Sequence, residues 1–156
     1  MGGKKMTGLY INKLKLKIKK AALLILVLPI FNLFVLSGFA QSQEIYIISN
    51  ASLQISLDDV KGAYLGRISK LDGEKIILLE PPAENPAKQK FLKEVLGMDI
   101  QSYRKLWLTK LMAGETPPQV KSEDEIIKEV SEKKSAVGYV SKKVEGGNIK
   151  IIGTIK

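Results

Sequence analysis

A lysine-rich segment followed by a long apolar run separates the first 40 residues of this chain from the rest. Residues 1–40 contain seven lysines and no acidic residue, and residues 21–36 carry no charge. The small residues Gly38 and Ala40 follow the run, and their spacing suits cleavage by a signal peptidase. The pattern predicts an export signal over residues 1–40, with Gln41 as the N-terminus after cleavage.

An uncleaved membrane anchor is the alternative interpretation of the same segment. Residues 21–40 form a stretch of 20 residues, and about 20 apolar residues are enough to cross a bilayer. Pro29 and Asn32 interrupt the stretch, which favours cleavage. In both cases we expect residues 41–156 to form one folded domain outside the cytoplasmic membrane. That domain is expected to be periplasmic or secreted, or membrane-anchored if the signal stays uncleaved.

The side chains available to the domain exclude several kinds of site. The sequence contains no cysteine and no histidine, which rules out disulfides, thiolate or imidazole metal ligands, and thiol or imidazole catalysis. We therefore expect a binding protein and no enzyme, with no metal and no cofactor. Residues 41–156 carry 18 basic and 16 acidic side chains, a net charge of +2. Such a near-balanced charge is not typical of nucleic-acid binding, so no nucleic-acid partner is expected.

Apolar periodicity, turn residues and capping residues predict the order of secondary structure. The expected strands cover residues 44–48, 75–80, 136–140 and 149–155, and the expected helices begin at Ser56, Pro86, Asp99 and Ser122. Short apolar strands that alternate with amphipathic helices are typical of an α/β fold. We expect a mixed central sheet flanked by about four helices.

Two of these helices carry apolar side chains at helical spacing, which predicts burial in the core. They are Leu57, Val60, Tyr64 and Leu65 in the first helix, and Ile100, Tyr103, Trp107, Leu108 and Leu111 in the third. Glu80 and Glu84 flank two prolines, and we interpret them as solvated loop residues instead of an acid and base pair.

Polar residues directly after the first predicted strand are candidates for a ligand site. Ser49, Asn50 and Ser52 lie between this strand and the next helix. In open α/β sheets, strand ends and helix N-termini converge, and their backbone amides can hold an oxyanion. Turn formation is the alternative role, because Ser and Asn are common turn residues. Asn85, in the loop before the second helix, is a comparable but weaker candidate.

Five further segments occur in a recognisable order. They are residues 60–68 (VKGAYLGRI), 71–73 (LDG), 90–98 (KFLKEVLGM), 107–118 (WLTKLMAG followed by a Pro-Pro pair) and 135–140 (SAVGYV). Together this series resembles phosphate ABC transporter substrate-binding proteins, in particular the short, single-lobe members of the type 2 periplasmic binding-protein superfamily. The resemblance covers about residues 44–141 and implies a single periplasmic-binding-protein-like lobe.

The resemblance also implies a function and a set of contacts. It implies an extracytoplasmic solute-binding protein for phosphate or a similar small oxyanion, with an ABC transporter permease or another envelope protein as partner. Ser49, Asn50 and Ser52 match the first-strand loop of the family, and Ser135, Gly138 and Tyr139 match its late strand near the hinge.

One departure from the family pattern concerns phosphate itself. Full-length receptors present an Arg and a Ser-Gly-Thr run to the phosphate, whereas residues 82–87 of this chain contain no arginine, no glycine and one carboxylate. A single open lobe also encloses an oxyanion less completely than two closing lobes do. We therefore expect weak binding. The alternative is an envelope accessory or scaffold protein that shares the fold and binds no small ligand.

Overall fold

The computed structural model describes residues 44–156, so the predicted export signal and its cleavage point lie outside the described residues. Strands and helices alternate along this part of the chain. They are β1 (Ile45–Asn50), α2 (Leu57–Tyr64), β2 (Lys70–Leu71), β3 (Glu74–Lys75), β4 (Ile77–Glu80), α3 (Pro86–Phe91), the π-helix η1 (Leu92–Leu96), α4 (Ile100–Met112), β5 (Gln119–Val120), α5 (Glu123–Glu132), β6 (Ala136–Val140) and β7 (Ile149–Ile155).

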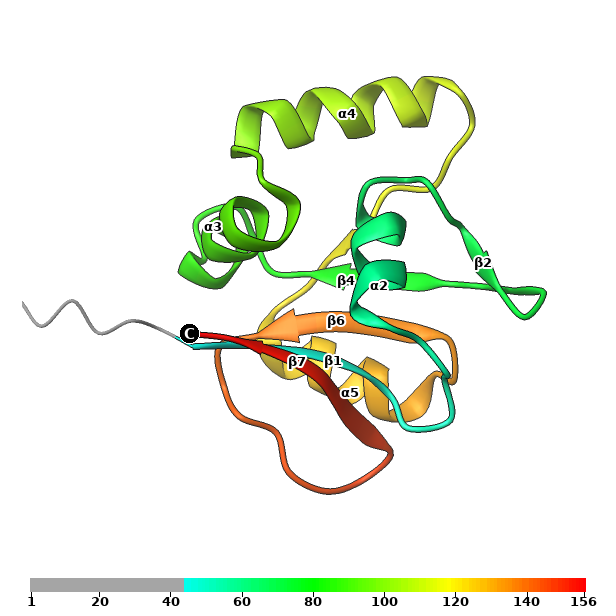
Figure 1. Ribbon diagram of the computed structural model, residues 1–156, viewed down its shortest axis with the longest axis vertical. Coiled ribbons are helices and arrows are strands. Elements are labelled where there is room, and N and C mark those ends of the chain that lie inside the picture. The colour runs from blue at the N-terminus through cyan, green and yellow to red at the C-terminus, as the bar shows by residue number, and fades with distance from the viewer. Residues whose placement is uncertain (1–43) are drawn as a thin grey trace, which may run out of the picture. The chain divides into compact units, whose positions relative to one another are not determined.

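The main sheet has five strands in the order β5-β4-β6-β1-β7. β4 is parallel to β5 and β6, whereas β1 is antiparallel to β6 and β7. The carboxyl ends of β4, β5 and β6 therefore share one end of the sheet, which we call its carboxyl end (Figure 1). The last residues of β1 lie at the opposite, amino end. The mixed central sheet expected from the sequence is confirmed.

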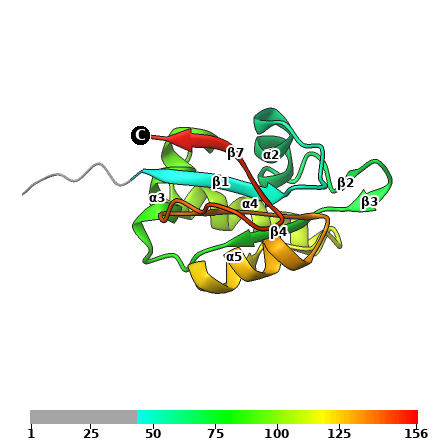
Figure 2. The same cartoon turned by 90° about the horizontal axis from the view of Figure 1, so that it is seen from below.

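Helices cover both faces of this sheet (Figures 1 and 2). On one face, α5 packs Ile126 and Val130 against Ile48, Leu79 and Val140. The other face carries α2, α3, η1 and α4, whose buried side chains form a larger cluster with β1 and β6. Within residues 44–156, the sheet and its four α-helices therefore enclose two apolar layers, one on each side of the sheet.

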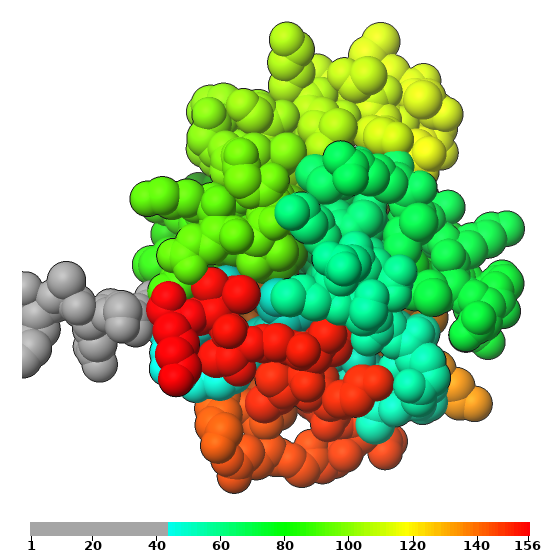
Figure 3. All heavy atoms as spheres, in the orientation of Figure 1, coloured from blue at the N-terminus to red at the C-terminus, as the bar shows by residue number. Residues whose placement is uncertain are grey.

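The edge strand β7 pairs only with β1 in the main sheet. Figure 3 shows this strand at the surface, as the red atoms next to α2. Most of its side chains are half-buried, and Ile152 and Ile155 pack against the larger apolar cluster. The apolar core therefore extends to the edge strand of the sheet.

Capping residues begin the helices where the sequence predicts. Ser56 and Asp59 form a reciprocal capping box at α2, and Ser122 and Glu125 form another at α5. The Asp99 carboxylate accepts a hydrogen bond from the Ser102 amide and so caps α4. These local predictions are confirmed because each depends on hydrogen bonds within one turn of the helix.

Three leucines predicted to lie in the core are instead exposed to solvent. Leu57 is 40% exposed, Leu108 is 60% exposed and Leu111 is 53% exposed. The prediction is wrong for α4 because only a narrow side of this outer helix, with Tyr103 and Trp107, reaches the core. The two α4 leucines line an open groove next to the very short strand β5, which does not cover them.

Candidate functional site

Asn50 lies at the amino end of the sheet, and every polar group of its side chain has a partner within the chain. Its Nδ2 donates to the carbonyl of Val130 at 2.8 Å and to that of Ser131 at 3.3 Å. Its Oδ1 accepts from the Ser52 amide at 3.0 Å and from the Ser52 hydroxyl at 2.6 Å. The Asn50 amide thus closes the turn after β1 and satisfies carbonyls at the C-terminus of α5, which otherwise lack helical partners.

The position of Asn50 beside the C-terminus of α5 makes its surroundings unfavourable for an anion. Ser49 is fully buried, and its hydroxyl donates to the Asn50 carbonyl at 3.2 Å. The C-terminus of a helix carries partial negative charge, which disfavours an anion next to it. An oxyanion here would also have to displace the bonds to Ser52. Ligand binding by Ser49, Asn50 and Ser52 stays a prediction, while the contacts of Asn50 are those of a turn and a helix cap.

The candidates on β6 pack into the two apolar layers. A methyl group on Gly138 would lie 2.5 Å from Cγ2 of Ile126, so the missing side chain lets α5 approach the sheet. The Tyr139 ring stacks on Phe91 with ring centroids 4.0 Å apart. Ser135 precedes β6, and its carbonyl accepts from the Ile77 amide at 2.9 Å. Ligand contacts by these three residues also stay predictions.

Asn85 lies at the carboxyl end of the sheet, so the structure does not bring it together with the turn at Asn50. Its Oδ1 accepts from the Ala87 amide at 2.8 Å and caps α3. Its Nδ2 donates to Oε1 of Glu123 at 2.9 Å. Asn85 therefore contacts the first residue of α5, an element that lies almost 40 residues later in the sequence.

The Glu123 carboxylate gathers donors from two loops at this end of the sheet. Besides Asn85, the Ser141 amide donates to Oε2 of Glu123 at 3.0 Å and the Ser141 hydroxyl donates to the same oxygen at 2.7 Å. Asn85 follows β4 and Ser141 follows β6. We call these three residues, Asn85, Glu123 and Ser141, the Glu123 site. Open α/β sheets bind ligands outside the carboxyl ends of their strands, which is where this site lies.

The surroundings of the Glu123 site are acidic. Glu84 and Asp124 line the same surface pocket, and Lys142 pairs with Asp124 at a distance of 3.1 Å. An amide nitrogen, a backbone N–H and a hydroxyl are donors that suit an oxyanion. Here these donors already bind the Glu123 carboxylate, so an incoming oxyanion must displace Glu123 or share the donors with it. Any oxyanion bound here would therefore compete with Glu123 for the same donors.

The sequence does not single out Glu123 and Ser141. A sequence signal for Ser141 is nevertheless present, because this residue directly follows the apolar strand β6. In the same way, Asn85 follows β4 in the loop before α3. What the sequence lacks is the spatial order of the strands, which places β6 beside β4 and so brings the two loops together. From the sequence alone, Glu123 at the start of α5 is recognisable only as an acidic residue that stabilises a helix N-terminus.

A buried charged cluster lies under α3 and α4. Lys88 donates to Oε1 of Glu80 at 2.6 Å, and the Tyr103 hydroxyl donates to Oε2 of Glu80 at 2.9 Å. Glu80 and Lys88 are each 5% exposed, so the prediction that Glu80 is a solvated loop residue is wrong. Burial raises the pKa of Glu80, although the Lys88 charge opposes that shift. Burial and the Glu80 charge also raise the pKa of Tyr103.

The Tyr139 hydroxyl points into the same region of the core. It is buried and has no hydrogen-bond partner within residues 44–156. Burial raises the pKa of Tyr139, and the Glu80 charge raises it further, so the phenol stays neutral. The cluster is an ion pair with both oxygens of the carboxylate satisfied, an arrangement that suits a structural role.

No group of three or more acidic side chains is placed to hold a metal ion in the part of the chain that the structure describes. None of the helices between residues 44 and 156 has the length and apolar character to cross a membrane.

Comparison with solved structures finds a similar fold in a protein assigned to phosphate transport. A Clostridium perfringens protein, assigned as a phosphate ABC transporter substrate-binding protein and solved with bound phosphate, aligns with a TM-score of 0.54 and 16% identity. The alignment covers 69% of this chain and 43% of that chain. An ABC-type phosphate transport receptor from Vibrio cholerae aligns with a TM-score of 0.47 and 15% identity, over 74% of this chain and 51% of that chain.

No protein-family model and no curated protein sequence matches the chain. The chain spans about half the length of the two receptors, or less. At the level of fold, the resemblance to phosphate receptors is confirmed. The described residues form an α/β domain whose fold is similar to that of part of the Clostridium perfringens protein.

Proposed function

We propose that this chain is an exported, non-enzymatic binding protein that binds phosphate or a similar small oxyanion weakly. The observation that carries the proposal is the fold shared with a receptor solved with bound phosphate. The missing cysteine and histidine support a binding role, as does the similarity to binding proteins. In this proposal residues 1–40 are the export signal and residues 41–156 are the binding domain, located in the periplasm or secreted.

We place the oxyanion at the Glu123 site. Among the candidates from the sequence, Asn85 lies at the carboxyl end of the sheet, where the fold class binds its ligands. Asn85 and Ser141 supply the donors, and Glu123 competes for them. Since the competing carboxylate belongs to the chain, the affinity for free phosphate is expected to be in the millimolar range.

The Clostridium perfringens receptor is assigned to an ABC transporter. By analogy, an ABC permease or another envelope protein is the proposed macromolecular partner. This part of the proposal rests on the fold alone, because the chain aligns with less than half of that receptor.

An accessory or scaffold role in the envelope is the second candidate function. One observation favours it: the Glu123 carboxylate satisfies the donors of Asn85 and Ser141 without any bound ligand. A chain that fills its own anion site needs no solute to complete the structure. In this case the lobe serves as a protein-binding module.

Isothermal calorimetry with inorganic phosphate separates the two candidates. The full chain is titrated in mild detergent and compared with Glu123→Gln, Ser141→Ala and the surface control Ser102→Ala. The receptor proposal expects weak heat from the wild type and the control, stronger binding by Glu123→Gln, and about tenfold weaker binding by Ser141→Ala.

One outcome contradicts the receptor proposal, and another contradicts only the placement of the oxyanion at the Glu123 site. If neither the wild type nor Glu123→Gln releases heat with phosphate, the accessory role is supported. If heat is present but is lost in a Ser49→Ala plus Asn50→Ala variant that remains folded, and not in Ser141→Ala, the ligand lies at the amino end of the sheet.

A further inference from the structure

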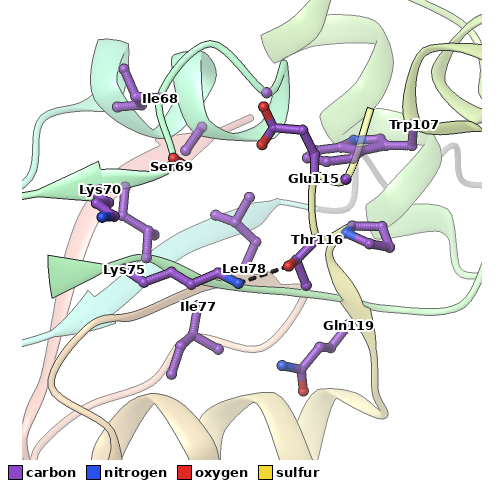
Figure 4. A pocket seen from close by; sticks show the side chains of 15 residues that line it. Ile68, Ser69, Lys70, Lys75, Ile77, Leu78, Trp107, Glu115, Thr116 and Gln119 are labelled. Carbon is purple, nitrogen blue, oxygen red and sulfur yellow. Dashed lines mark hydrogen bonds between the residues drawn. The ribbon is translucent and has the colours of Figure 1, made fainter. Parts of the chain in front are cut away.

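A second pocket lies between the β2–β3 hairpin and the loop after α4. It has a volume of about 390 Å³ and includes residues from the start of β4. The Glu123 site is at the carboxyl end of the same sheet, so the two sites are separate. Figure 4 shows the lining side chains of this pocket, which we call the hairpin pocket.

Two lysines face each other across the hairpin. Lys70 on β2 and Lys75 on β3 are direct cross-strand partners. The turn between the strands fixes this register, because Asp72 with φ 50° and Gly73 with φ 84° both adopt the left-handed conformation of a tight hairpin turn. Like charges directly opposite each other destabilise a sheet. Neither lysine has an ion-pair partner within residues 44–156.

Both lysines line the hairpin pocket together with neutral polar groups. The Lys75 ammonium donates to the Thr116 hydroxyl at 2.7 Å, as the dashed line in Figure 4 marks. Ser69 and Gln119 line the same space. Two ammonium groups without an ion-pair partner, with hydroxyl and amide groups on the same lining, offer donors to one anionic group.

The remaining wall of the hairpin pocket is apolar. Ile68, Ile77, Leu78 and Trp107 line it, and Trp107 is almost fully buried. Glu115 lies at the same pocket, so its charged lining consists of two cations and one anion. A net charge of +1 on the lining suits a monoanion better than a phosphate dianion.

We propose that the hairpin pocket binds a small organic monoanion, a carboxylate attached to a single aromatic ring or a branched alkyl group. Its carboxylate pairs with Lys70 and Lys75, and its apolar body packs against Trp107 and Leu78. The pocket volume lies near the lower end of the range for small-molecule sites, about 300–1,000 Å³, which fits a ligand of this size. This inference does not depend on oxyanion binding at the Glu123 site.

The intrinsic fluorescence of Trp107 reports on binding, because it is the single tryptophan of the chain and lines the pocket. The full chain is titrated with phenylacetate, with neutral phenylacetamide and with inorganic phosphate. We expect a saturable change with phenylacetate, about tenfold weaker binding of phenylacetamide, and no saturable change with phosphate.

Variants assign the signal to the hairpin pocket, because Trp107 also lines the open groove beside α4. Lys70→Gln combined with Lys75→Gln is expected to weaken phenylacetate binding about tenfold or more. The control pair Lys128→Gln and Lys134→Gln, on exposed positions in and after α5, keeps the wild-type affinity. Thr116→Val, a second variant of similar shape, weakens binding in the same direction as the lysine pair.

The following results overturn the proposal. They are the lack of a saturable phenylacetate signal in the wild type, an unchanged affinity in both the lysine pair and Thr116→Val, or equal binding of phenylacetamide. None of these results affects phosphate calorimetry at the Glu123 site, which uses Ser141→Ala. Conversely, phosphate heat that vanishes only in the lysine pair contradicts both placements.

Discussion

The Lys88 ammonium lies 2.6 Å from a Glu80 carboxylate oxygen, and both side chains are buried. The pair joins the last residue of β4 to α3, and the Tyr103 hydroxyl connects it to α4. In a domain with two apolar layers, this cluster is a polar link between the sheet and two of its covering helices.

Replacing one partner of this ion pair is expected to destabilise the fold strongly. Lys88→Met leaves the Glu80 charge buried without its partner, a change that typically costs about 3–5 kcal/mol. The double variant Glu80→Leu with Lys88→Met removes both charges and is expected to recover most of that loss. Urea unfolding measures both free energies. A Lys88→Met protein as stable as the wild type contradicts the buried pairing.

The raised pKa of Glu80 predicts a specific pH dependence of stability. Because the folded-state pKa lies above the ordinary value of 4.5, the folded protein holds this proton more tightly than the unfolded chain does. The contribution of Glu80 is therefore fully present below pH 4.5 and is lost as the pH rises through the folded-state pKa.

Glu80→Gln isolates this dependence, because exposed carboxylates with lowered pKa values, such as Asp59 and Asp99, act in the opposite direction in both proteins. The wild type is expected to lose stability relative to Glu80→Gln as the pH is raised above 4.5. Unfolding free energies at a series of pH values check this result. A difference that stays constant, or grows in favour of the wild type, excludes the raised pKa.

Gly138→Ala is expected to push α5 away from the sheet. The added methyl would lie 2.5 Å from Cγ2 of Ile126, closer than packed carbon atoms can approach. Overpacking of this kind costs about 1–3 kcal/mol. In Gly138→Ala with Ile126→Ala the clash is absent, so the two changes together should destabilise less than the sum of the single changes. A double-mutant cycle from thermal unfolding measures this coupling, and additive effects argue against the contact.

Asn50→Ala tests the structural role of the turn after β1. The change removes the donor to the carbonyls of Val130 and Ser131 and the acceptor for Ser52. A buried carbonyl left without a hydrogen bond typically costs about 1–3 kcal/mol, and we expect the free energy of unfolding to fall by an amount in that range. Ser52→Ala, which removes only a hydroxyl, is the milder control. Equal stability of both variants and the wild type, measured by urea unfolding, rules out the capping role.

Local signals in the sequence predict much of this fold. The capping boxes that begin at Ser56 and Ser122 and the Asp99 cap place three helices correctly. The two C-terminal strands have their predicted bounds, Ala136–Val140 and Ile149–Ile155. Each of these features depends on side chains a few residues apart, so the sequence carries them directly.

Features that depend on distant contacts are not predictable in the same way. Glu80 looks solvated beside two prolines, yet Lys88 and Tyr103 enclose it once α3 and α4 are packed. β5 has two residues and no apolar pattern, so only its pairing with β4 defines it. The candidate site follows the same rule: Asn85 is recognisable as a loop residue, but Glu123 joins it only through the order of the strands.

The bonds from Asn85 and Ser141 to Glu123 also have a consequence for how the domain responds to its surroundings. A tethered group competes with a high effective concentration, often in the millimolar range for flexible tethers, which does not change with dilution. If the proposed function holds, free oxyanions must exceed that value before they occupy the donors, and trace amounts are expected to leave the domain unaltered. A single Glu-to-Gln exchange would remove this internal threshold without rebuilding the fold.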